Sequence, residues 1–117
     1  MMVPAPAQGA LGIEVRADDV ETRDLLRRIN DAVSEAEATA ERACLAALEG
    51  GCQVPVGALA RALGDTMTLT ACVCSLDGKT VLRAKETGSS ANPADLGQRA
   101  ADDLLKQGAA EIIAAIR

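Results

Sequence analysis

The sequence predicts an α+β fold, in which a small three-stranded antiparallel sheet has helices packed against it and is preceded by a strand–helix arm. Three observations point to this fold. Residues 67–75 alternate between apolar and small polar side chains, which is typical of a half-buried strand. Asp77-Gly78 marks a hairpin that returns the chain into a neighbouring strand. Apolar residues before residue 50 and after residue 91 instead recur at helical spacing.

The composition limits the size and density of the core. The chain has 117 residues, which allows one domain and a detached arm. Its hydrophobic fraction is 49%, but it has no Phe, Tyr or Trp, so aliphatic side chains and many alanines must fill the core. Because alanine buries little area, we expect a thin core.

Charge and cysteine usage exclude several classes of function. The net charge is −5 without a basic cluster, which argues against nucleic acid and anionic membranes as partners. No apolar run has membrane-spanning length and no signal peptide is recognisable, so we expect a cytoplasmic protein with reduced thiols. The chain has no histidine and no Cys-x-x-Cys spacing, so we expect no metal site.

The first 33 residues read as an arm. Residues 10–16 alternate as a strand, but nothing nearby supplies a sheet, so the strand is expected to belong to a sheet whose other strands are absent. Asp18-Asp19 caps a helix predicted over residues 20–33. We therefore divide the chain into an arm, 1–33, and a C-terminal domain, 34–117.

A second helix is predicted over residues 35–49. Ser34 and Glu37 have the spacing of a capping box, and Gly50 is placed to end the helix. Cys44 lies on the apolar side and is expected to be a small buried hydrophobe. The expected apolar face consists of Ala36, Ala40, Ala43, Cys44, Ala47 and Leu48.

Three strands and two further helices complete the predicted domain. The strands are expected over residues 54–63, with a break at Gly57, over 67–75 and over 80–87. Asn92 caps the next helix, with Pro93 at its first position. Leu96, Ala100, Leu104 and Leu105 are expected to pack on the sheet, and Ile112, Ile113 and Ile116 of a terminal helix over 109–116 are expected to point inward.

Two sequence blocks carry a family resemblance. Thr39-Ala40-Glu41-Arg42-Ala43, followed by Leu48-Glu49-Gly50-Gly51-Cys52-Gln53-Val54-Pro55-Val56-Gly57, resembles the hydroxymethylbilane synthase family, also called porphobilinogen deaminase. The opening segment, residues 4–14, is similar to the family's segment that leads out of its second domain. Ala7 departs from the family's usual glycine, which affects only the local turn.

The resemblance implies a covalent cofactor. In the family, the cysteine that matches Cys52 carries a dipyrromethane through a thioether bond. Porphobilinogen units are added to it with loss of ammonia, and hydroxymethylbilane is released by hydrolysis. Gly51 leaves clearance for a pyrrole ring beside the thiol. Independently of the family, Cys52 follows a helix C-terminus and no histidine is present, which argues against hydrolase-type cysteine catalysis.

The resemblance assigns weaker roles to four other residues and none to catalysis. Gln8 and Gly9 match the segment near the cofactor, so a cofactor contact is expected, the alternative being a simple hinge. Glu41 and Arg42 are expected to be structural or interdomain residues. The family's catalytic aspartate and substrate-binding arginines lie in its first and second domains, so this fragment holds no catalytic residue. Its expected partners are the missing N-terminal domains and, for the whole enzyme, porphobilinogen.

Two other functions stay open from the sequence. The chain could be a non-catalytic interaction module that pairs through the exposed edge of residues 10–15. It could also be a redox module that uses Cys72 and Cys74, although neighbouring positions on one strand face rarely have disulfide geometry. We expect structural roles for both cysteines.

Overall fold

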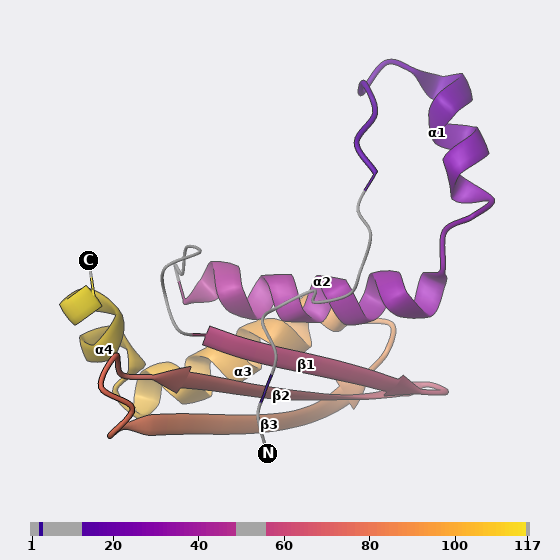
Figure 1. Cartoon of the computed structure of the whole chain (residues 1–117). Coiled ribbons are helices and arrows are strands. Elements are labelled where there is room, and N and C mark those ends of the chain that lie inside the picture. The colour runs from indigo at the N-terminus through magenta and orange to yellow at the C-terminus, as the bar shows by residue number, and fades with distance from the viewer. Residues whose placement is uncertain (1–2, 4–12, 49–55, 117) are drawn as a thin grey trace.

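Three antiparallel strands in the order β1-β2-β3 form a sheet, and two long helices pack side by side against one of its faces (Figure 1). This computed structural model describes residue 3, residues 13–48 and residues 56–116. The elements are α1 (Val20–Arg27), α2 (Ala32–Ala47), β1 (Val56–Leu63), β2 (Thr66–Cys74), β3 (Val81–Ser89), α3 (Pro93–Lys106) and α4 (Ala109–Ile116). The predicted α+β fold is confirmed.

The buried core lies between the sheet and helices α2 and α3. Alternation along β2 turns Met67, Leu69, Ala71 and Val73 towards these helices, and all four are fully buried. Many of the other core residues are alanines, as the composition predicts: Ala40, Ala58, Ala60, Ala84, Ala100, Ala101 and Ala109. Small side chains on both layers let the helices and the sheet approach closely.

At Gly97, α3 lies directly against the backbone of α2. A Cβ added there would lie 2.7 Å from Ala43 Cβ and 2.8 Å from the Cys44 nitrogen, and closer still to the Ala40 carbonyl oxygen. Only glycine fits this crossing, because the obstacle includes the α2 backbone. The close packing of α2 and α3 therefore requires a glycine at position 97.

The boundary between the first two helices differs from the prediction. Asp19 caps α1 as expected, but α1 ends at Arg27 and α2 begins at Ala32. Asp31, not Ser34, is the N-cap of α2. Its carboxylate accepts the Val33 N–H at 3.1 Å and the Ser34 hydroxyl at 2.7 Å. The predicted helices over 20–33 and 35–49 were wrong at this boundary because the Asp31 side chain satisfies the first turn of α2.

Several strand predictions also need correction. Residues 13–16 are not in a strand, and the rest of the strand predicted over 10–16 lies outside the described residues. Gly57 does not break β1, because it pairs with Cys72 within the ladder. Strand β3 runs to Ser89 rather than residue 87.

The last two helices follow the prediction with one exception. Leu96, Ala100 and Leu104 of α3 are fully buried, whereas Leu105 is 37% exposed because it lies on the outer side of the helix. Ile113 of α4 is buried and Ile112 is partly buried against the core. The side chain of Ile116, also expected to point inward, lies outside the described part of the chain.

Helix α1 projects away from the sheet (Figure 1). It contributes no buried residue. Five large apolar side chains of the described part of the arm are 52–70% exposed: Ile13, Val20, Leu25, Ile29 and Val33. This region therefore has an apolar surface that the C-terminal domain does not cover.

Candidate cofactor-attachment site

The segment that contains Cys52 joins two buried positions of the core. Leu48, which caps the C-terminus of α2, is 2% exposed, and its N–H donates to the Cys44 carbonyl at 3.1 Å. Val56, the first residue of β1, is 8% exposed. Cys52 and Gly51 lie outside the described residues, as do Gln8 and Gly9. The structure thus defines the two ends of the Cys52 segment rather than the thiol itself.

Glu41 holds α2 against β1. The residue is 6% exposed, and its Oε2 accepts the Ala60 N–H at 2.9 Å. One helical turn earlier, Glu37 Oε2 accepts the Ala62 N–H at 2.9 Å. Because α2 precedes the Cys52 segment and β1 follows it, these two bonds fix the relative position of the elements that flank it.

Sequence reasoning assigned Glu37 to a capping box and did not identify its contact with β1. The Glu-x-x-x-Glu spacing could have predicted that both carboxylates contact the same neighbouring element, since residues four apart on a helix share one face. Arg42 is exposed and makes no ion pair with any residue that the structure describes. The two neighbours therefore differ: Glu41 contacts β1, whereas Arg42 points towards solvent.

The three described cysteines are free thiols, and two of them are buried. Cys44 is fully buried, and burial raises the pKa of its thiol to about 11. Cys72 is 7% exposed, and burial, followed by the nearby Cys74, raises the pKa of its thiol. Both therefore stay protonated at neutral pH and are poor nucleophiles. Cys72 and Cys74 share one face of β2, as predicted, and form no disulfide.

Other kinds of site find no support in the described part of the chain. It contains no group of three or more His, Cys, Asp or Glu side chains placed to hold a metal ion. None of its helices is long and apolar enough to cross a membrane. A shallow pocket of about 370 Å³ lies between the β2–β3 turn and α4, and no predicted site residue lines it. Its lining consists of Ser75, Leu76, Asp77, Glu111, Ile112 and Ala115.

Comparison with known proteins decides the family. The family model described as porphobilinogen deaminase, C-terminal domain, matches residues 35–106. This range covers most of α2, the Cys52 segment, all three strands and α3. The chain belongs to the porphobilinogen deaminase family. The resemblance inferred from the two sequence blocks is thereby confirmed.

The similarity extends beyond the matched domain to the arm. Porphobilinogen deaminase of Desulforudis audaxviator (strain MP104C) is 51% identical over 117 residues, which is 100% of this chain and 38% of the relative. The porphobilinogen deaminases of Exiguobacterium sp. (strain ATCC BAA-1283 / AT1b) and Chlorobium chlorochromatii (strain CaD3) are 47% and 46% identical. They cover 99% and 100% of this chain, and it covers 37% and 39% of them. The chain therefore spans less than two fifths of the length of these relatives.

Proposed function

We propose that this chain is the C-terminal, cofactor-bearing part of a porphobilinogen deaminase. This transferase condenses four porphobilinogen units, with loss of ammonia, into hydroxymethylbilane. The observation that carries the proposal is the similarity to enzymes of that name over the whole chain, including the segment that holds Cys52. The pathway is porphyrin and heme biosynthesis.

Cys52 is the proposed attachment point of a dipyrromethane cofactor through a thioether bond. When bound, this group supplies the end to which porphobilinogen units are added. The protein environment of the other thiols supports Cys52 over Cys44 and Cys72, since both of these are buried and have raised pKa values. An attachment site must admit a pyrrole ring, and Gly51 beside Cys52 leaves room for one. Gln8 and Gly9 are proposed to contact the same group.

The roles proposed for the two parts of the chain are supported by which of their side chains are buried. Residues 34–117 form the cofactor-attachment domain, and residues 1–33 form an arm that completes the first domain of the whole enzyme. Helix α1 buries none of its residues, and the exposed apolar side chains of Leu25 and Ile29 would be covered there. Arg42, exposed on α2, is proposed to contact that part of the enzyme. The free thiols agree with a reducing, cytoplasmic location.

The 117-residue chain alone is proposed to be inactive, because its catalytic and substrate-binding domains lie elsewhere in the enzyme. A chimera tests this division of labour. It replaces the matched segment of the Desulforudis audaxviator enzyme with this chain, which is 51% identical to it. Porphobilinogen consumption is expected in the chimera and absent in the chain alone. A chimera that folds but consumes no porphobilinogen, or a chain that is active alone, would contradict the proposal.

A further inference from the structure

Cys72 and Cys74 form a pair of thiols on the sheet face turned away from α2 and α3. They are two positions apart on β2, and alternation along a strand places such positions on the same side. Both thiols are free. Cys72 is 7% exposed, whereas Cys74 is half-buried, so the pair has one protected and one accessible member. The attachment chemistry proposed for Cys52 uses neither of them.

The two thiols are close enough to affect each other. Burial and then the charge of Cys74 raise the pKa of the Cys72 thiol, and a side-chain hydrogen bond with Cys74 raises it further, so the two side chains are in contact. The Gly57 main chain and the charge of Arg83, both aligned with Cys72 across the sheet, lower the pKa without offsetting these effects. Cys72 therefore keeps its proton at neutral pH.

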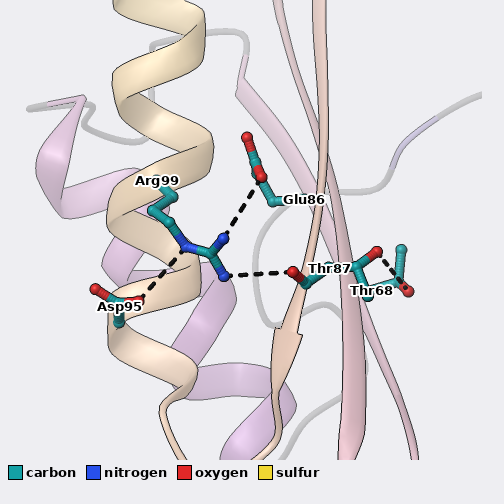
Figure 2. Close-up of polar contacts among 5 residues, drawn as sticks. All are labelled: Thr68, Glu86, Thr87, Asp95 and Arg99. Carbon is teal, nitrogen blue, oxygen red and sulfur yellow. Dashed lines mark hydrogen bonds and ion pairs between the residues drawn. The ribbon is translucent and has the colours of Figure 1, made fainter.

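The donors at this position of the sheet are sulfur atoms, whereas the oxygen donors of the strands lie elsewhere (Figure 2). Of the residues in the three strands, only Glu86 is acidic, and it lies on the helix side, 3.8 Å from Arg99. The hydroxyl groups of Thr68 and Thr87 lie 3.4 Å apart, nearer the other end of β2. No third His, Cys, Asp or Glu side chain joins the thiol pair among the residues that the structure describes. A ligand of this pair must therefore be soft and be satisfied by two sulfur atoms.

The spacing of the pair favours a bridge through an added atom over a direct disulfide. Positions two apart on a strand have Cα atoms about 7 Å apart, whereas most disulfides join Cα atoms about 4.4–6.8 Å apart. An atom placed between the two sulfurs lengthens the bridge and removes this restriction.

The protonated state of Cys72 narrows the choice of that atom. A thiophilic cation such as Cu(I) would have to displace both thiol protons, and the two thiolates would leave a net negative charge at a largely buried position, which is costly. A trivalent arsenic compound exchanges its hydroxyl groups for thiols instead. Because each thiol proton leaves as water, the product at the buried sulfur carries no charge.

We propose that Cys72 and Cys74 form a binding site for monosubstituted trivalent arsenic compounds, R–As(OH)₂. The accessible Cys74 reacts first: its sulfur bonds to arsenic, one As–O bond breaks, and the hydroxyl leaves with the thiol proton as water. Cys72 displaces the second hydroxyl in the same way, which gives a neutral S–As–S bridge and a second water. Arsenic stays trivalent, so the reaction needs no oxidant or reductant. The second step is intramolecular, so the pair holds the compound more tightly than one thiol does.

Phenylarsine oxide, which hydrates to such a compound, tests the site on the isolated 117-residue chain. The chain carries Cys52→Ser, so that the proposed cofactor thiol does not contribute. Binding is measured by titration in excess 2-mercaptoethanol, which competes with single-thiol adducts, and the adduct is located by peptide mapping. We expect one arsenical per chain, bridging Cys72 and Cys74 and removed by 1,2-ethanedithiol.

Single substitutions make the test specific. Cys74→Ser and Cys72→Ser are each expected to weaken binding about 100-fold or more, because the second sulfur–arsenic bond is lost. Cys44→Ala removes a fully buried thiol of α2 and is expected to leave binding unchanged. Cys74 is the decisive position, because it is half-buried and serine there is expected to leave the domain folded, which circular dichroism checks.

Three results would overturn the proposal. They are the absence of an adduct on the folded chain, unchanged affinity in folded Cys74→Ser, and an adduct that forms only after the chain is unfolded in urea. Cys52 is replaced in every sample, so the result is independent of cofactor attachment and of the proposed function.

Discussion

Glu41 accepts a hydrogen bond from the main-chain N–H of Ala60 at 2.9 Å, which links the middle of α2 to an edge strand 19 residues further along the chain. Glu37 makes the equivalent bond to Ala62. Unpaired N–H groups on an edge strand invite pairing with another strand. Two carboxylates of α2 occupy these N–H groups on β1, so the sheet is less open to strand addition on this side.

At the opposite edge of the sheet, formed by β3, side chains donate hydrogen bonds to the main chain instead of accepting them. On β3, the Arg83 carbonyl accepts from Gln107 Nε2 at 2.8 Å, and the Thr87 carbonyl accepts from Arg99. Side chains of α2 thus satisfy N–H groups at one edge, and side chains of α3 and of its C-cap residue Gln107 satisfy carbonyl groups at the other. The two helices stabilise the sheet through its edges as well as through the apolar core.

Removing the Glu41 carboxylate is expected to destabilise the domain. In Glu41→Ala, the buried Ala60 N–H loses its acceptor, and the free energy of unfolding should fall by about 1–3 kcal/mol. Glu41→Gln keeps an acceptor oxygen and should recover most of that loss. Urea unfolding of the 117-residue chain measures both. Arg42→Ala, an exposed neighbour, is the control and should change stability by no more than about 0.5 kcal/mol. Equal stability of Glu41→Ala and Arg42→Ala would show that the bond contributes nothing.

Gly97→Ala is expected to destabilise the domain as well. Alanine normally stabilises a helix by about 1 kcal/mol relative to glycine. At this position, however, the new Cβ would overlap the α2 backbone near Cys44, and overpacking of this kind costs about 1–3 kcal/mol. A lowered urea midpoint is the predicted result, with Gln98→Ala on the exposed side of α3 as the control. A raised urea midpoint for Gly97→Ala would contradict this prediction, because it would show that α2 and α3 accommodate the new Cβ without loss of stability.

The buried Cys44 thiol predicts a loss of stability at high pH. Burial raises its pKa from 9.0 to about 11, so the folded state holds the proton more tightly than the unfolded state. The resulting stabilisation is complete below about pH 9 and is lost as the pH rises through about 11, to a total of about 2–3 kcal/mol. Unfolding free energies across this range should fall more steeply for the parent chain than for Cys44→Ala. Cys74→Ala, at a half-exposed position, should keep the steep dependence. Parallel curves for the parent and Cys44→Ala would contradict the assignment.

Patterns with period two were sufficient to predict the sheet, whereas helix ends were not predictable from spacing alone. The alternation over Met67 to Val73 reports burial on one face, which is a local property of a strand. The capping-box spacing of Ser34 and Glu37 was misleading, because Glu37 instead contacts Ala62 on β1. That contact depends on the tertiary fold, and no local pattern contains it.

The charge of the sheet face turned away from α2 and α3 was also not evident from the sequence. Arg61, Arg83 and Lys85 are dispersed along the chain, and only the pairing of three strands brings them onto one surface. The sequence showed no basic cluster for this reason. Cys52, by contrast, was selected by its sequence block alone, and burial of Cys44 and Cys72 agrees with that choice.

The most direct test of the central claim is the mass of the cofactor-bearing segment. The chimera with the Desulforudis audaxviator enzyme is produced, supplied with porphobilinogen, denatured and analysed by intact mass and peptide mapping. We predict an added mass of one dipyrromethane on the peptide that contains Cys52, lost in Cys52→Ser and retained in Cys74→Ser. An unmodified Cys52 in a folded chimera, or an adduct on another residue, would contradict the account.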